Sequence, residues 1–220
     1  MAVKVKICGV RTPAVIGAAA EEDADFVGLV LFPKSPRHVK IEEARVLAAI
    51  AKGKLGTVAV LVDPDDALID AIVDRVRPDL LQLHGTETPQ RVAEIKARAG
   101  LPVMKAIAIA EVADVAKANA YTGSADYLLF DAKAPASATL PGGNGLAFDW
   151  RTLKGANAPF GLSGGLTPDT VGEAIRLTGA SLVDVSSGVE SVQCEKDIVL
   201  VRRFIQTAKA AAPQARAKAS

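Results

Sequence analysis

The chain has 220 residues, of which half are hydrophobic and only 4% are aromatic. Its 26 basic and 25 acidic residues leave a formal net charge of +1, which gives no electrostatic support for binding nucleic acid or a membrane surface. No apolar run approaches the roughly 20 residues that cross a bilayer, and two cysteines are too few for a disulfide framework. We therefore expect a single domain (1–220) in a reducing cytoplasm.

Short apolar runs alternate with helical stretches along the whole chain. The apolar runs predict eight strands, at 3–7, 26–31, 56–62, 79–83, 102–107, 125–130, 160–163 and 181–186. Helices are predicted at 13–23, 41–52, 65–76, 88–99, 110–120, 168–178 and 197–211, with a short one near 149–154. This alternation implies an α/β fold with a parallel sheet and right-handed crossovers. Eight units without a GxGxxG fingerprint favour a closed (β/α)8 TIM barrel over an open sheet. Residues 210–220 lack apolar periodicity and are predicted to fray.

Strand alternation predicts which side chains enter the barrel lumen. Successive residues of a strand point to opposite faces, and the face toward the helices should be apolar. This turns the following polar residues inward: Lys6, Cys8, Gln82, His84, Asp184 and Ser186. A buried ammonium without a partner is costly, so we expect Lys6 to pair with Asp184 or Asp131. Lys4, near the rim, is expected to reach solvent.

Catalytic groups of such a barrel lie at the carboxyl ends of its strands. Read in order, the predicted ends carry Cys8, Lys34, Arg37, Asp63, His84, Lys105, Asp131, Gly164, Gly165, Ser187 and Gly188. Polar residues often end strands, so this census alone is a weak signal. The only histidines, His38 and His84, have no matching cysteine or glutamate spacing, and we expect no metal site.

Cys8 is a candidate catalytic thiol. An isolated cysteine is more often a small buried hydrophobic residue. Here Lys6 shares the same strand face, and a neighbouring cation favours the thiolate. Cys194, in a charged loop, is interpreted as an incidental surface thiol.

Asp131 is a candidate acid at the end of the sixth strand. An aspartate in this position can simply begin a turn. The loop that follows, 132–148, is long and contains PGGNG at 141–145, and long glycine-containing loops in compact barrels are more often functional.

Two glycine-containing turns predict a phosphate site. Ser163-Gly164-Gly165 and Ser186-Ser187-Gly188 each follow an apolar run, and Thr167-Pro168-Asp169 predicts a helix start. Bare backbone N–H groups near a helix N-terminus form an anion cup. Arg37, in a loop flanked by prolines, is either a solvated side chain or a guanidinium that captures a carboxylate.

These motifs together resemble one enzyme family. KICGVRT, GLVLFPKSPRHV, LLQLHGTE, LLFDAKAP, PGGNGLAFDW, GLSGGLTPDTV and VDVSSGVES occur in the order seen in phosphoribosylanthranilate isomerases of tryptophan biosynthesis. The resemblance spans residues 4–197. It implies a (β/α)8 barrel with no metal and no cofactor. It also implies an Amadori rearrangement of N-(5-phosphoribosyl)anthranilate to 1-(2-carboxyphenylamino)-1-deoxyribulose 5-phosphate.

The resemblance also implies residue roles. Cys8 is expected to be the general base, Asp131 the general acid and Arg37 the residue that holds the anthranilate carboxylate. The expected phosphate cup consists of Gly164, Gly165, Ser187 and Gly188, and Asp184 and His84 are expected to line the substrate pocket. The chain departs from the family pattern in the loop SSGVESVQCEKD, in GGNG and in VDPDD.

Other functions remain open at this point. A non-catalytic barrel that only binds a phosphorylated ligand would keep the glycine turns. The histidine-pathway aminoaldose isomerase typically uses aspartates at strands one and five, where this chain has Cys8 and Lys105-Ala106. Indole-glycerol-phosphate synthase needs extra N-terminal helices, for which two residues before the first strand leave no room. The expected partner is a small phosphosugar, and the chain is expected to be a monomer or homodimer.

Overall fold

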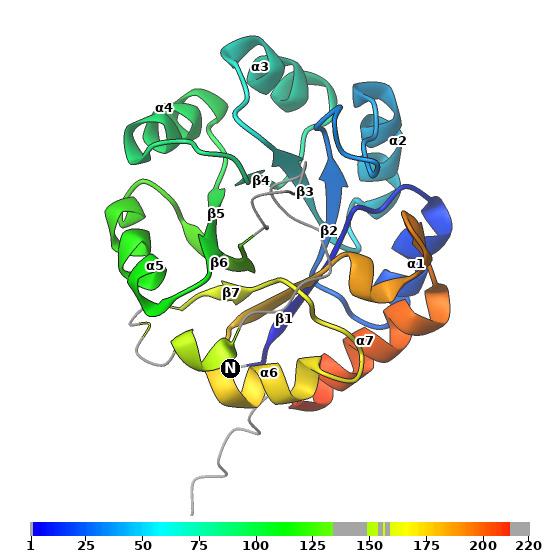
Figure 1. Cartoon of the computed structure of the whole chain (residues 1–220). Coiled ribbons are helices and arrows are strands. Elements are labelled where there is room, and N and C mark those ends of the chain that lie inside the picture. The colour runs from blue at the N-terminus through cyan, green and yellow to red at the C-terminus, as the bar shows by residue number, and fades with distance from the viewer. Residues whose placement is uncertain (1, 134–148, 154–155, 157–158, 212–220) are drawn as a thin grey trace, which may run out of the picture.

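Eight parallel strands close into a barrel in the computed structural model of the chain (Figure 1). The structure describes residues 2–133, 149–153, 156 and 159–211. The strands are β1 (Lys4–Cys8), β2 (Phe26–Val30), β3 (Gly56–Leu61), β4 (Leu80–Leu83), β5 (Val103–Ile109), β6 (Tyr127–Ala132), β7 (Gly161–Leu162) and β8 (Leu182–Val185). Each pairs with the next, and β1 closes the barrel by pairing with β8. All eight predicted strands are thereby confirmed, and so is the TIM-barrel fold.

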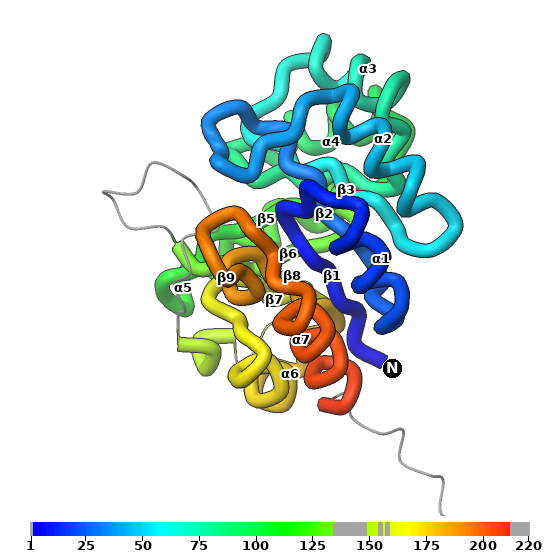
Figure 2. Tube along the Cα trace, turned by 90° about the vertical axis from the view of Figure 1, so that its right-hand side faces the viewer, coloured from blue at the N-terminus to red at the C-terminus, as the bar shows by residue number. Residues whose placement is uncertain are grey.

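Helices surround this barrel as a second layer (Figure 1). They are α1 (Pro13–Glu21), α2 (Ile41–Ala51), α3 (Asp66–Arg75), α4 (Pro89–Ala99), α5 (Val112–Lys117), α6 (Val171–Thr178) and α7 (Ile198–Ala211). Short 3-10 helices occur at η1 (Ala118–Tyr121), η2 (Trp150–Leu153) and η3 (Ser187–Val189). In Figure 2, α6 and α7 lie side by side, and the two helices are in contact. Residues 210 and 211 still belong to α7, so the predicted frayed tail begins too early, and 212–220 lie outside the described residues.

Local sequence signals explain several helix ends. α4 begins after Thr88, whose side chain accepts a hydrogen bond from the N–H of Arg91, with Pro89 in the first turn. The same helix ends at Gly100, whose φ of 63° suits a residue without a Cβ. α6 differs from expectation, because Thr170 rather than Thr167 is its N-cap residue. Thr167 instead donates its N–H to the Thr170 hydroxyl, in a turn that precedes the helix.

Two separate apolar clusters fill the molecule. The larger lies between the outer barrel face and the helices, and the smaller fills the lumen. The lumen cluster consists of Cys8, Val30, Val58, Val60, Leu80, Met104, Ala106, Leu129 and Leu182. On β4, β6 and β8 the polar residues Gln82, Asp131 and Asp184 have the same parity as lumen residues of their own strand. The predicted alternation is therefore confirmed, and Lys4 is exposed as expected.

Lys105 does not lie at a strand end. β5 continues to Ile109, so Lys105 lies within the strand, on the face opposite Met104. Its ammonium is buried against Glu87, with Nζ 2.8 Å from Oε2, and it also donates to the carbonyl of Gly85. The sequence census of strand ends was wrong at this position because it ended the fifth strand at 107. Among the described helices, none is long and apolar enough to cross a membrane.

Candidate active site

The first feature of the lumen is a buried ion pair between the first and last strands. Lys6 Nζ lies 2.9 Å from Asp184 Oδ1, and both side chains are almost fully buried. Burial is the largest single effect and would lower the pKa of Lys6, but the charges and hydrogen bonds of Asp184 and Cys8 together outweigh it, and the net shift is upward. Lys6 is therefore a charged ammonium, and the predicted acidic partner is Asp184 rather than Asp131.

Cys8 lies at the end of β1, on the same face as Lys6 and 8% exposed. A Cβ atom at Gly28 would lie 3.0 Å from Cys8 Sγ and 3.1 Å from Lys6 Nζ, so both groups flank the bare backbone of that glycine. Burial raises the pKa of the Cys8 thiol, and the positive charge of Lys6 offsets this only in part. The sequence pointed only to the cation that favours the thiolate, whereas in the structure the desolvation of that thiolate is the larger effect on the pKa.

Asp131 lies in β6 and belongs to a row of three polar side chains. Its Oδ2 atom is 3.0 Å from His84 Nε2, and His84 Nδ1 is 3.0 Å from Gln82 Nε2. Asp131 and Gln82 are buried, and the His84 side chain is 15% exposed. His84 thus touches the candidate acid directly, which its expected role as a pocket-lining residue did not predict.

The two pairs belong to one electrostatic cluster. Burial raises the pKa of Asp184, and the negative charge of Asp131 raises it further while His84 lowers it. The Lys6–Asp184 pair also acts on Cys8, as described above. Cys8 and Asp131 therefore both lie within electrostatic range of the Lys6–Asp184 pair.

Arg37 is buried and already holds a carboxylate of the chain itself. Its Nε and Nη2 atoms lie 2.7 and 2.8 Å from the two carboxylate oxygens of Glu190. The third guanidinium nitrogen, Nη1, has no hydrogen bond or ion pair to any residue that the structure describes. One edge of the guanidinium is fixed, and the Nη1 end remains available to a second anion.

Glu190, which the sequence analysis did not single out, is the residue that holds Arg37. It begins a two-stranded hairpin, β9 (Glu190–Val192) and β10 (Glu195–Lys196), and also accepts from Lys196 Nζ at 2.6 Å. Burial would raise its pKa, but the hydrogen bonds from Arg37 and Lys196 hold it down at about 2. The N–H of Cys194, at a positive φ of 70°, completes the contacts. The loop SSGVESVQCEKD, in which the chain departs from the family pattern, therefore contains an ordered turn that holds Arg37 in place.

The two predicted glycine turns lie side by side after β7 and β8. Gly164 and Gly165 have φ of 89° and 64°, and neither donates its N–H to an acceptor in the described ranges. A Cβ on Gly188 would lie 1.8 Å from the carbonyl oxygen of Leu166, so only glycine permits this approach. Ser187 is half-buried beside it. The structure brings the two turns together, and the helix that follows them starts later than expected.

Comparison with known proteins gives the family. The model of N-(5'-phosphoribosyl)anthranilate (PRA) isomerase matches residues 5–207. The chain is 54% identical to N-(5'-phosphoribosyl)anthranilate isomerase of Rhodopseudomonas palustris strain BisA53, over 96% of this chain and 97% of that one. It is 52% identical to that of Cereibacter sphaeroides strain ATCC 17029, over 94% and 99%. This chain belongs to the N-(5'-phosphoribosyl)anthranilate isomerase family.

Solved structures of the same family share the barrel. Phosphoribosyl anthranilate isomerase from Thermotoga maritima superposes with a TM-score of 0.85 at 32% identity, covering 94% of this chain and 99% of that one. A second isomerase structure, in complex with reduced 1-(o-carboxyphenylamino)-1-deoxyribulose 5-phosphate, superposes with a TM-score of 0.82 at 31% identity and the same coverage. The resemblance seen in the motifs is thereby confirmed.

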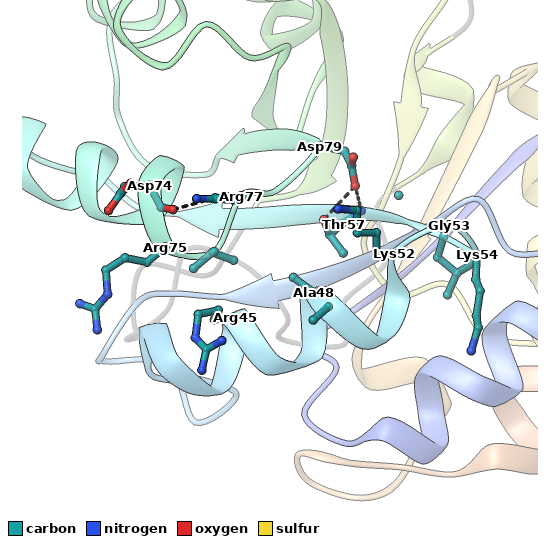
Figure 3. Close-up of a pocket in the computed structure, with 14 residues that line it drawn as sticks. Arg45, Ala48, Lys52, Gly53, Lys54, Thr57, Asp74, Arg75, Arg77 and Asp79 are labelled. Carbon is teal, nitrogen blue, oxygen red and sulfur yellow. Dashed lines mark hydrogen bonds between the residues drawn. The ribbon is translucent and has the colours of Figure 1, made fainter.

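A hollow lies at the end of this isomerase-family barrel that is opposite the candidate active site. The cavity of about 680 Å³ lies between α2 and α3, next to the amino ends of β3 and β4 (Figure 3). Its cations, including Lys52, Lys54 and Arg77, are exposed. Cys8 ends β1 and Asp131 lies one residue before the end of β6, both toward the opposite rim, so this cavity is separate from the candidate active site.

The glycine-containing loop and the metal site are the two remaining subjects of the sequence predictions. PGGNG at 141–145 lies outside the described residues. Among the residues that are described, no cluster of three histidine, cysteine, aspartate or glutamate side chains could hold a metal ion.

Proposed function

We propose that this chain converts N-(5-phosphoribosyl)anthranilate to 1-(2-carboxyphenylamino)-1-deoxyribulose 5-phosphate, an aldose–ketose isomerisation of tryptophan biosynthesis. The observation that carries the proposal is the shared lumen of Cys8 and Asp131 beside two glycine turns. One end of such a substrate is a phosphate and the other a benzoate carboxylate, which matches the glycine turns and Arg37 at one rim.

Asp131 acts first, as the general acid. In its protonated form it delivers a proton to the furanose ring oxygen while the C1'–O bond breaks. The anilino nitrogen donates its lone pair to C1' and forms an iminium ion. The Asp131 carboxyl is buried and lies 3.0 Å from His84 Nε2, and a carboxyl held in place in this way can serve as a general acid.

Cys8 acts second, as the general base. The iminium acidifies the proton on C2', and the Cys8 thiolate removes it. The electron pair of that C–H bond forms the C1'–C2' enolamine, and the nitrogen becomes neutral again. The enolamine then takes up a proton at C1' and loses the proton of its C2' hydroxyl, which gives the amino-ketone. Because the substrate's own nitrogen serves as the electron sink, this sequence of steps calls for no added cofactor.

The remaining residues bind and orient the substrate. The free Nη1 end of Arg37 receives the anthranilate carboxylate, while Glu190 keeps the other edge of the guanidinium in place. Gly164, Gly165, Ser187 and Gly188 offer backbone N–H groups to the phosphate. Holding both ends of the substrate converts binding into orientation at the reacting carbons.

We assign Asp184 and His84 to the wall of the substrate pocket. The ion pair of Asp184 with Lys6 and the contact of His84 with Asp131 support this assignment. We expect a small phosphosugar to be the partner of this site. A cytoplasmic monomer or homodimer without nucleic acid remains our expectation for the whole protein.

A fluorescence assay tests the function, since consumption of the anthranilate-linked substrate quenches its emission. Cys8→Ala and Asp131→Asn should each lower kcat by about 10²–10⁴ with modest loss of binding. Cys194→Ala is the matched control and should turn over normally. Turnover at the parent rate in either lumen variant refutes the assigned roles. Tight phosphosugar binding without any turnover in the parent protein would favour the non-catalytic barrel instead.

A further inference from the structure

Gln82 is a fully buried side chain for which the proposed reaction has no use. It lies in β4 on the lumen face, and none of its surface is exposed. Its Nε2 atom is 3.0 Å from His84 Nδ1. Its Oε1 atom is buried and has no hydrogen-bond partner among the described residues. A buried amide that leaves one atom unsatisfied costs free energy, so its orientation calls for a reason.

The distribution of protons among Asp131, His84 and Gln82 explains the orientation of the Gln82 amide. A neutral imidazole carries one N–H, and an ionised Asp131 accepts hydrogen bonds but donates none. While Asp131 is ionised, the 3.0 Å contact to its Oδ2 atom therefore needs the proton on His84 Nε2. His84 Nδ1 then has only a lone pair, and Gln82 must present its NH₂ group to it. The reverse orientation of the amide would leave both N–H groups of Gln82 buried without acceptors, which is the costlier arrangement.

We propose that Gln82 is a positioning residue that fixes His84 as the Nε2–H tautomer, so that the catalytic proton of Asp131 resides on Oδ1. This rests on the proposed function, in which Asp131 is the acid.

The two oxygens of Asp131 then have different roles. Oδ2 accepts from His84 whether the carboxyl is ionised or neutral, and so stays free of the proton. Oδ1 accepts the N–H of Ala132 at 3.0 Å, and a Cβ at Gly164 would lie 3.0 Å from it. Oδ1 is therefore the oxygen that faces the glycine turn proposed to hold the phosphate. Gln82 acts on the reaction only through His84, by deciding which oxygen can deliver the proton.

Among the described residues, Asp131 is the one charged group in direct contact with His84. Asp184 lies within electrostatic range but has the Lys6 ammonium as its partner. Gln82, on the other side of the ring, is uncharged, so no second anion contacts Nδ1.

Nitrogen-15 NMR of the imidazole side chains tests this tautomer directly. The chain has two histidines, so the spectrum is simple, and the signals that vanish in His84→Asn belong to His84. In the ligand-free parent protein at neutral pH, Nε2 should carry the proton and Nδ1 should be bare. A parent spectrum with the proton on Nδ1 overturns the proposal without any need for a variant.

The variant Gln82→Glu tests whether Gln82 sets the tautomer of His84. Glutamate at this position can only accept, so Nδ1 of His84 should gain a proton, and kcat should fall about tenfold or more with KM within about threefold. Gln90→Glu, an exposed site on α4, is the matched control and should change neither spectrum nor kcat. A bare Nδ1 in Gln82→Glu, or a parent-like kcat with Nδ1 protonated, contradicts the proposal.

The same experiments separate this inference from the proposed function. The NMR spectrum reports the tautomer of His84 directly. This result does not depend on whether the parent protein turns over N-(5-phosphoribosyl)anthranilate. If Gln82→Glu does not fold, the parent spectrum still decides. Absence of isomerase activity in a parent protein with the expected spectrum would refute the function and leave the positioning of His84 intact.

Discussion

Lys6 and Asp184 are direct cross-strand partners at the point where the barrel closes. They occupy matching positions in the pairing of β1 with β8, and their charged atoms lie 2.9 Å apart. The pair therefore joins the first and last strands inside the lumen and places a fixed positive charge next to Cys8. This arrangement links the closure of the barrel to the chemistry of the candidate site.

Lys6→Met should destabilise the protein strongly. It leaves Asp184 buried without a counter-ion, and removing one partner of a buried pair typically costs about 3–5 kcal/mol. Lys4→Met, two residues away on the same strand but exposed, should change the free energy of unfolding by less than about 0.5 kcal/mol. Urea denaturation of both variants measures this. A Lys6→Met protein as stable as Lys4→Met would show that the pair contributes little.

The raised pKa of Cys8 predicts slow alkylation at neutral pH. A raised pKa means that the thiol form persists to higher pH, so the thiolate that reacts with iodoacetamide appears only above the ordinary value of about 8.5. In a Cys194→Ala background, in which Cys8 is the remaining thiol, the rate should keep rising beyond pH 9. The kcat/KM of the isomerase reaction should rise over the same range if Cys8 is the base. Rapid, pH-independent alkylation near pH 7 would instead indicate a thiolate at rest.

The sequence was sufficient for the barrel because each strand carries its own local signal. Apolar runs of four to seven residues fix the strands, and alternation within them turns Lys6, Gln82 and Asp184 inward. The need to neutralise a buried ammonium narrowed the partner of Lys6 to Asp184 or Asp131, and the structure shows that it is Asp184. These inferences depend only on residues within one strand and on the energetic cost of burial.

Other features could not be predicted from sequence patterns, because they depend on competing electrostatic effects or on contacts between residues far apart in the chain. The ionisation of Cys8 depends on whether burial or Lys6 dominates, and only coordinates decide that. Arg37 and Glu190 are 153 positions apart, and the hairpin that brings them together has strands of two and three residues. The roles assigned to Cys8, Asp131 and Arg37 in the reaction stay predictions.

The lowered pKa of Glu190 predicts a pH dependence of stability. A carboxyl whose folded pKa lies below its unfolded value stabilises the protein above the unfolded pKa, near 4.3, and loses that effect as the pH falls toward the folded value of about 2. The shift corresponds to about 3 kcal/mol. The parent protein should therefore lose stability between about pH 5 and pH 2.

Glu190→Gln is the variant that isolates this contribution. Its amide keeps the size of the side chain but does not titrate, so the stability difference from the parent should be largest at pH 6–7 and shrink below about pH 4. Urea unfolding at several pH values measures the difference. Asp149→Asn, at an exposed ion pair with Arg151, serves as the comparison and should show little effect. A difference that is constant between pH 2 and 7 would contradict the assigned pKa.

Gly188→Ala should damage the proposed phosphate cup through the backbone. The added Cβ would lie 1.8 Å from the carbonyl oxygen of Leu166, so the turn after β8 must move away from the turn after β7. Because the two turns are proposed to share the phosphate, we expect KM to rise about tenfold or more. Gly17→Ala is the matched control, since a Cβ there meets nothing within 4 Å and alanine favours the helix by up to about 1 kcal/mol. Steady-state kinetics with both variants distinguish the outcomes, and an unchanged KM in Gly188→Ala would exclude this turn from phosphate binding.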